Sequence, residues 1–170
     1  MSDPLRWGIL GTGRIARKFA GGSLMDIGCY AINLARALAG CEPTAMHVAA
    51  HLHPSGVDDY AAGCLDFHGE VLAAFTCGMT VEADRTTYAC GSEGYAAIDF
   101  PWFSDGTFRL VRAGKPETIR AQASMDLYAL EAEAFAAAVQ DGTEPWISKA
   151  DTLAKMRVLD ELRRQIGLSF

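Results

Sequence analysis

Six residues near the N-terminus have the spacing of a dinucleotide-binding turn. The segment Gly11-Thr12-Gly13-Arg14-Ile15-Ala16 follows the pattern Gly-x-Gly-x-x-Ala, directly after Leu5–Leu10, which we expect to be a buried strand. Such glycines permit a tight turn and let a pyrophosphate approach a helix N-terminus. The pattern is weak alone, because it also needs a second parallel strand and an acidic residue about twenty positions later. Residues 31–36 fill that window without a carboxylate, so the glycines could also simply turn the chain.

A carboxylate and a phenol lie four residues apart, at Asp26 and Tyr30. This separation places two side chains on one face of a helix. The helix is expected to begin at Ser23, an N-cap with Asp26 at the acidic position of a capping box, and to end at Gly40. Between them, apolar residues recur at the three- and four-residue intervals of a core-facing helix: Leu24, Ile27, Ala31, Leu34, Ala35 and Leu38.

Three histidines, His47, His51 and His53, share one parity in an expected strand and so share one side of it. A zinc site needs three or four convergent ligands, and the spacing places no further Cys or His beside them. We therefore expect a solvated or interface-facing strand surface here, and no metal.

The elements that must position these residues change type along the chain. Residues 44 to about 120 predict about six antiparallel strands, because tight turns such as Gly91-Ser92-Glu93-Gly94 join antiparallel neighbours. The last fifty residues predict two helices, the first followed by Gly142 and the second capped by Ser148. The expected fold class is α+β, with an open-faced, mainly antiparallel sheet and helices on one face.

Composition excludes several classes of partner. The 170 residues carry a net charge of −6 that is not gathered into runs. Nucleic acids and anionic membranes select clustered basic residues, so neither is an expected partner. Five cysteines without a C-x-x-C pair favour reduced thiols in a cytosolic protein. The sequence shows no charged-then-apolar leader and no apolar run of membrane-spanning length, so we expect a cytoplasmic location and no membrane partner.

Four stretches together resemble one protein family. "LRWGILGTGRIARKFA" is similar to the first strand, loop and helix of the glucose–fructose oxidoreductase/inositol dehydrogenase/MocA family, and "GGSLMDIGCYAINLARALAG" to the helix that opens its second domain. "YACGSEGYAAID" and "EAEAFAAAVQDGTEPWISKADTLAKMRVLDELRRQIGL" resemble a later hairpin and the C-terminal helices. The likeness covers almost the whole chain and is nearest to the branch with xylose dehydrogenases and dihydrodiol dehydrogenases.

The chain departs from the family between Ala20 and Gly21. There the family carries the rest of its cofactor domain, on the order of a hundred residues, including a Glu-Lys-Pro motif whose lysine is a catalytic acid/base. No Glu-Lys-Pro occurs in this chain. The resemblance therefore implies that residues 1–20 are a short Rossmann-like βα remnant of a dinucleotide-binding domain. Residues 21–170 then form a C-terminal α/β substrate and oligomerisation domain.

The resemblance also implies roles for the candidate residues. Gly11, Thr12, Gly13, Arg14, Ile15 and Ala16 would contact the pyrophosphate of NAD(P), although this chain could also bind no cofactor. Asp26 and Tyr30 match residues that line the family's substrate pocket beside the nicotinamide. A phenol near a carboxylate and a lysine can exchange a proton with a sugar hydroxyl. The alternative is that Asp26 caps its own helix and Tyr30 packs.

Two functions follow as expectations. The first is a truncated NAD(P)-dependent oxidoreductase acting on a sugar, a polyol or a diol, with impaired cofactor binding and a sugar-like small molecule as substrate. The second is a catalytically silent oligomerisation module derived from the C-terminal domain of such an enzyme. In both, the uncovered sheet face predicts self-association into a homodimer or larger assembly.

Overall fold

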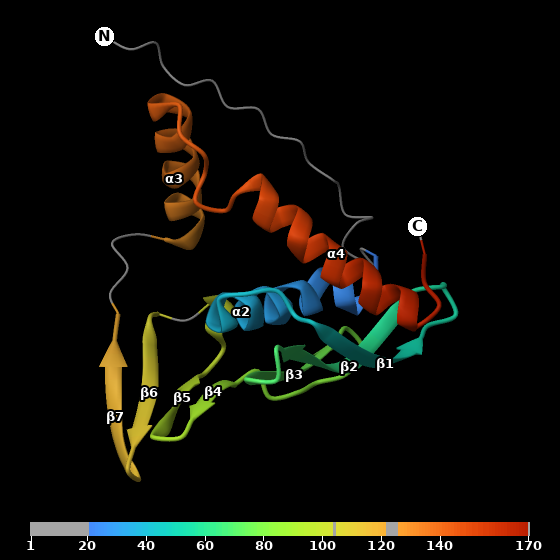
Figure 1. Cartoon of the computed structure of the whole chain (residues 1–170), viewed down its shortest axis with the longest axis horizontal. Coiled ribbons are helices and arrows are strands. Elements are labelled where there is room, and N and C mark those ends of the chain that lie inside the picture. The colour runs from blue at the N-terminus through green and yellow to red at the C-terminus, as the bar shows by residue number, and fades with distance from the viewer. Residues whose placement is uncertain (1–20, 104, 122–125, 170) are drawn as a thin grey trace. The chain divides into compact units, whose positions relative to one another are not determined.

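The structure, a computed structural model, describes residues 21–103, 105–121 and 126–169 (Figure 1). The expected strand Leu5–Leu10 and the turn from Gly11 to Ala16 lie outside these residues. The chain divides into two compact units, with boundaries after Glu82 and after Trp146. Both units combine antiparallel strands with helices, which confirms the α+β class.

The first unit pairs three strands with a group of helices. Its helical elements are the π-helix η1 (Leu24–Gly28), which runs directly into α2 (Cys29–Ala39), and α4 (Lys149–Gln165). Its strands β1 (Ala45–Leu52), β2 (Asp58–Phe67) and β3 (Val71–Gly78) form an antiparallel sheet in the order β1-β2-β3. Figure 1 shows α2 and α4 on the same side of this sheet.

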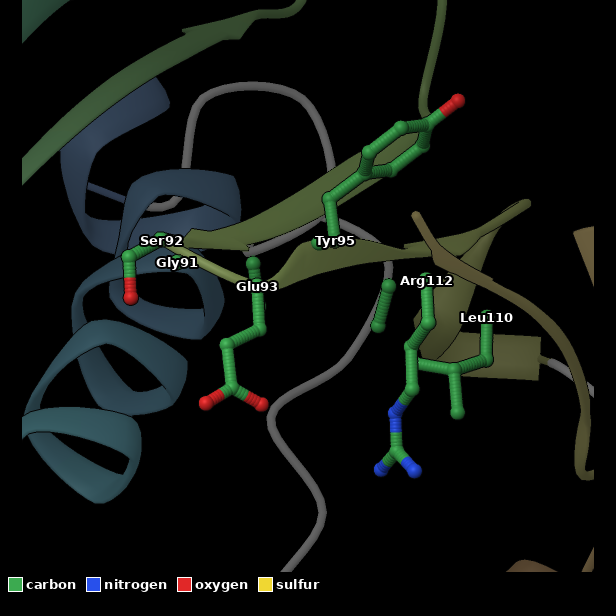
Figure 2. Close-up of a pocket in the computed structure, with 9 residues that line it drawn as sticks. Gly91, Ser92, Glu93, Tyr95, Leu110 and Arg112 are labelled. Carbon is green, nitrogen blue, oxygen red and sulfur yellow. The ribbon is translucent and has the colours of Figure 1, made fainter. Parts of the chain in front are cut away.

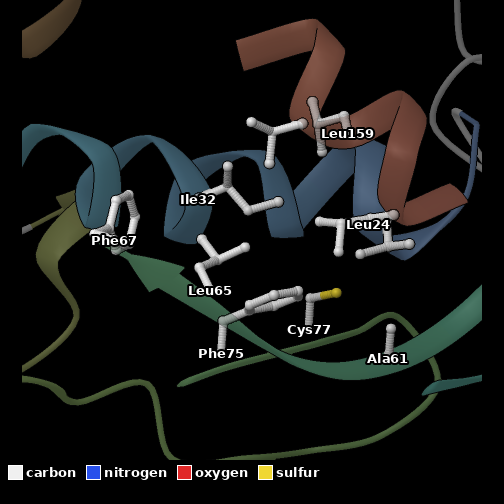
Figure 3. Packing of buried hydrophobic residues seen from close by; sticks show 10 residues of the cluster. Leu24, Ile32, Ala61, Leu65, Phe67, Phe75, Cys77 and Leu159 are labelled. Carbon is white, nitrogen blue, oxygen red and sulfur yellow. The ribbon is translucent and has the colours of Figure 1, made fainter. Parts of the chain in front are cut away.

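The core of the first unit lies between the helices and one face of that sheet. Figure 3 shows Leu24, Ile32 and Leu159 of the helices packed toward Leu65 and Phe75 of the strands. All five are less than a tenth exposed. Alternate strand residues point into this core because successive side chains of a strand point to opposite faces. The helices are therefore held on the sheet mainly by burial of apolar surface.

The opposite face of the three-stranded sheet, here called the open face, is exposed in the chain. None of its exposed residues is Lys, Arg, Asp or Glu, although they come from all three strands: Ala45, His47, Ala49, His51, Tyr60, Ala62, Cys64, Leu72, Ala74 and Thr76. Tyr60 is 40% exposed and Leu72 is 76% exposed. One face of this sheet is therefore uncovered in the chain, as expected, and it carries one half-buried acid, Asp66.

The second unit contains a four-stranded meander and one longer helix. The strands β4 (Thr87–Gly91), β5 (Gly94–Ile98), β6 (Thr107–Arg112) and β7 (Lys115–Arg120) pair antiparallel in chain order. The short 3-10 helix η2 (Pro101–Phe103) lies between β5 and β6, and α3 (Leu127–Asp141) follows β7.

Two details of the sheet differ from expectation. The described residues form seven strands rather than about six, and they pair as two sheets rather than one. The ladder of β3 ends at Gly78, and the Met79 amide donates to Asp59 O at 2.8 Å as the chain leaves the sheet. Alternating apolar residues predict strands but not which strands pair. The pattern therefore could not predict that β3 and β4 belong to different sheets.

Candidate functional site

Asp26 and Tyr30 lie on one continuous helical run at the start of the first unit. Asp26 is the third residue of η1, and Tyr30 is the second residue of α2. Asp26 is exposed, and Tyr30 is 53% exposed. A π-helical turn has wider hydrogen-bond spacing than an α-helix and is frequent at functional sites. The structure thus presents a carboxylate and a phenol to solvent from an unusual helix start.

The capping role expected for Ser23 is wrong. Ser23 has α-helical dihedrals, and its side chain makes no cap hydrogen bond. Its Oγ donates instead to Oδ2 of the buried Asp58, at 2.7 Å. The Asp26 amide donates to the Gly22 carbonyl at 3.1 Å, so the expected Ser23–Asp26 capping box does not form. A buried carboxylate from a distant strand replaces the local cap.

Two thiols lie close to this helix start: Cys77 of β3, which is buried, and Cys29, the half-buried first residue of α2. A Cβ added at Gly28 would lie 3.2 Å from Cys77 Sγ, so η1 packs tightly against β3. Burial raises the pKa of the Cys77 thiol. Burial likewise raises the pKa of Cys29, with the Lys155 ammonium opposing the rise. A raised pKa keeps a thiol protonated and makes it a poor nucleophile, so neither cysteine is a candidate nucleophile here.

The described residues do not form a dinucleotide site. A pyrophosphate of this kind binds at the carboxyl end of parallel strands, against a helix N-terminus. Every strand pair in the described part of the chain is antiparallel. The cofactor contacts expected at Gly11–Ala16 lie outside the described residues.

A second polar cluster lies at the edge of the open face. His51 Nδ1 is 2.7 Å from Asp59 Oδ1, and Thr80 Oγ1 donates to Asp59 Oδ2 at 3.0 Å. The His51 ring stacks on Tyr60, with centroids 5.0 Å apart. A register shift between His51 and Leu52 leaves Asp59 without a directly opposite residue in β1, because Tyr60 pairs with His51 and Asp58 pairs with Leu52. Sequence reasoning missed both aspartates, although two acids opening an apolar strand are an unusual pattern.

The Asp59 cluster predicts a pH-dependent stability. The hydrogen bond from His51 holds the pKa of Asp59 below its usual range. The Asp59 carboxyl therefore binds a proton more readily in the unfolded chain than in the folded chain. The stabilisation of the folded chain is present above the unfolded pKa, about 4. It is lost as pH falls through the lower folded pKa. Urea unfolding between pH 3 and pH 7 should show that Asp59→Asn destabilises the chain at pH 7 but much less at pH 3.

The matched control is Asp160→Asn, at an exposed position of α4. A stability difference between the wild-type chain and Asp59→Asn that stays constant from pH 7 to pH 3 would contradict the assignment.

The open His-containing face does not assemble a metal cluster. Among the described residues, no three His, Cys, Asp or Glu side chains are grouped to hold a metal ion. His47 and His51 both lie on the open face, as their parity predicted. The expected place of His53 in the same strand is wrong, because β1 ends at Leu52.

A shallow hollow lies on the β4–β5 hairpin of the second unit. It measures about 390 Å³, and Figure 2 shows Glu93 and Arg112 extending to one side of the hairpin while the Tyr95 ring extends to the other. The four turn residues from Gly91 to Gly94 are among the residues that line it. It lacks the enclosed apolar lining of a small-molecule site, so the candidate site remains the η1–α2 segment. Within the described residues, no helix has the length and apolar character needed to cross a bilayer.

Comparison with known proteins finds one matching family model and several similar enzymes. A family model described as the GFO/IDH/MocA C-terminal domain matches residues 6–97. The D-xylose 1-dehydrogenase (NADP(+)) 2 of Haloferax volcanii is 28% identical over 163 residues, covering 88% of this chain and 47% of that protein. Human trans-1,2-dihydrobenzene-1,2-diol dehydrogenase is 34% identical over 85 residues, covering 49% of this chain and 25% of the human protein.

A solved structure of an oxidoreductase is also similar to this chain. The aldose–aldose oxidoreductase from Caulobacter crescentus, complexed with glycerol, superposes with a TM-score of 0.76 and 27% identity. The match covers 85% of this chain and 45% of that one. This chain therefore spans about half, or less, of the length of these relatives.

Proposed function

Because this chain belongs to the GFO/IDH/MocA family, we propose that it is the substrate-side part of an NAD(P)-dependent oxidoreductase that acts on a sugar, a polyol or a diol. The observation that carries the proposal is the exposed pair Asp26 and Tyr30 on the η1–α2 run. The names of the similar proteins, a xylose dehydrogenase and a diol dehydrogenase, support a hydroxyl-bearing substrate.

The proposed chemistry of these two residues is proton transfer. Oxidation of a hydroxyl requires that its oxygen lose a proton while its carbon loses a hydride. Tyr30 Oη would take the substrate proton and pass its own proton to the Asp26 carboxylate; reduction reverses both transfers. In such enzymes NAD(P) supplies the hydride acceptor. Since the described residues form no dinucleotide site, proton transfer is the part of the reaction that they account for.

Cofactor binding by this chain alone is proposed to be impaired. The Gly11–Ala16 segment has the glycine spacing, but the sequence about twenty residues later offers no acid for the ribose. The relatives are also about twice as long as the part that matches. We propose that residues 1–20 are the remnant of a dinucleotide-binding domain and that a truncated enzyme results. Its five cysteines are free thiols, which supports a reducing, cytoplasmic location.

A second candidate function is a catalytically silent oligomerisation module. The open face of β1, β2 and β3 supports it, because this face carries exposed apolar residues and its one acidic residue, Asp66, is half-buried. Sheets pack face to face about 10 Å apart, and the small side chains Ala49, Ala62 and Ala74 suit that approach. We propose a second copy of this chain as the occupant, with or without residual enzyme activity.

Titration of NADH and NADPH into the purified chain tests whether its cofactor binding is impaired. Nicotinamide fluorescence should show no saturation below millimolar cofactor if binding is impaired as proposed. Saturable binding at micromolar cofactor would contradict impairment, and oxidation of D-xylose and of a trans-dihydrodiol would then be assayed directly. The matched control is Gly13→Val, which should abolish any binding that uses the glycine turn. Binding that survives this substitution would exclude the turn as its site.

A further inference from the structure

Asp58 joins the start of η1 to the sheet. It is the first residue of β2 and is 0% exposed. Its Oδ2 accepts hydrogen bonds from Ser23 Oγ and from the Leu24 amide, both at 2.7 Å. The first amides of a helix have no partner within the helix itself, so they need an acceptor from elsewhere. Asp58 supplies that acceptor from a residue 34 positions away in the chain.

The backbone before η1 is shaped to admit this carboxylate. Gly22 has φ of +95°, and a Cβ added there would overlap Asp58 Oδ1. Only glycine gives both this left-handed conformation and the space for the carboxylate. The sequence Gly22-Ser23-Leu24 is therefore explained residue by residue: the first leaves room, and the next two donate to Asp58.

The carboxylate is retained at a cost. In the described part of the chain, its Oδ1 is buried without a hydrogen-bond partner. A buried carboxylate oxygen left unsatisfied is unfavourable, whereas an apolar residue would avoid the cost. The positive end of the η1–α2 run partly offsets the charge. An apolar residue could not accept the hydrogen bonds from Ser23 Oγ and the Leu24 amide, so this acceptor role explains why a carboxylate occupies the position.

We propose that Asp58 is a positioning residue for Asp26 and Tyr30. By fixing Leu24, two residues before Asp26, it sets where η1 begins and so directs both side chains. Asp58 does not itself contact substrate in this proposal. The link to catalysis rests on the proposed oxidoreductase function, while the fixing of η1 is independent of it.

Hydrogen exchange of the full chain, followed by mass spectrometry, tests the proposal without an activity assay. Asp58→Asn keeps one acceptor oxygen but loses the charge, and Asp58→Ala loses both. Exchange of the peptide covering Leu24–Gly28 should accelerate about tenfold in Asp58→Ala and less in Asp58→Asn. Peptides of β2 and α4 should change far less. Ser23→Ala keeps the hydrogen bond from the Leu24 amide to Asp58. Its exchange rate at Leu24–Gly28 should lie between those of the wild-type chain and Asp58→Ala.

Two results would overturn the proposal. One is unchanged exchange at Leu24–Gly28 in both Asp58 variants. The other is an equal acceleration across the whole first unit, which would mean that Asp58 supports stability only. If the wild-type chain turns over substrate, Asp58→Asn should lower kcat with KM nearly unchanged. Absence of turnover in the wild-type chain would agree with the proposed impairment of cofactor binding and leave the exchange result decisive for Asp58.

Discussion

Tyr30→Phe is expected to lower the kcat of the oxidoreductase reaction by about 10²–10⁴-fold, the usual contribution of a positioned acid–base group. The substitution removes the hydroxyl that relays the proton and keeps the ring. Tyr30 is 53% exposed, so the fold should be almost unaffected. Because the phenol acts on the transferred proton rather than on binding, KM should stay nearly constant. Because cofactor binding is proposed to be impaired, steady-state kinetics with substrate and NADP⁺ above millimolar concentration measures both constants.

A control variant and an Asp26 variant complete the test of Tyr30. Tyr88→Phe makes the same chemical change at a residue of similar exposure, 55%, in the second unit, and should leave kcat unchanged. Asp26→Asn should lower kcat to a similar extent as Tyr30→Phe. If the two residues form one relay, the double variant should be little worse than either single variant. Additive losses, or an active Tyr30→Phe variant, would contradict the relay.

Local signals in the sequence were sufficient for several helix ends. Gly40 ends α2 with φ of +69°, and Gly142 ends α3 with φ of +64°. Ser148 caps α4 by accepting from the Asp151 amide. In each case the residues that fix the geometry lie within one turn of the helix end, so a short window of sequence contains the whole interaction.

The start of η1 could not be predicted in that way. Ser23 has the chemistry of an N-cap, yet its hydroxyl bonds Asp58, which is 35 positions away. The spacing of residues in the sequence does not predict which residue of a distant strand will contact the start of a helix. The alternation of β1 and β2 correctly placed His47 and His51 on one face, but the register shift that brings Asp59 to His51 has no short-range signature. Long-range polar contacts thus define the site's surroundings.

The substitution Ala62→Glu on the open face is expected to dissociate an assembly of two or more copies of this chain into monomers. Ala62 lies on the central strand β2, opposite Ala49 and Thr76. If two copies pack through this face about a twofold axis, each new carboxylate is buried against a face without basic residues and near its symmetry mate. Unpaired like charges of this kind cost several kcal/mol, so association should weaken by about two orders of magnitude or more.

Light scattering over a micromolar concentration series measures this effect. The wild-type chain should have at least twice the monomer mass of 18.2 kDa, and Ala62→Glu should approach the monomer mass. Ala37→Glu makes the same substitution at an exposed position of α2, away from the open face, and should keep the wild-type mass. Circular dichroism must show equal folding of all three chains. A monomeric wild-type chain, or an Ala62→Glu variant with unchanged mass, would exclude the open face as a self-association surface. The open face would then have to be covered by a different chain.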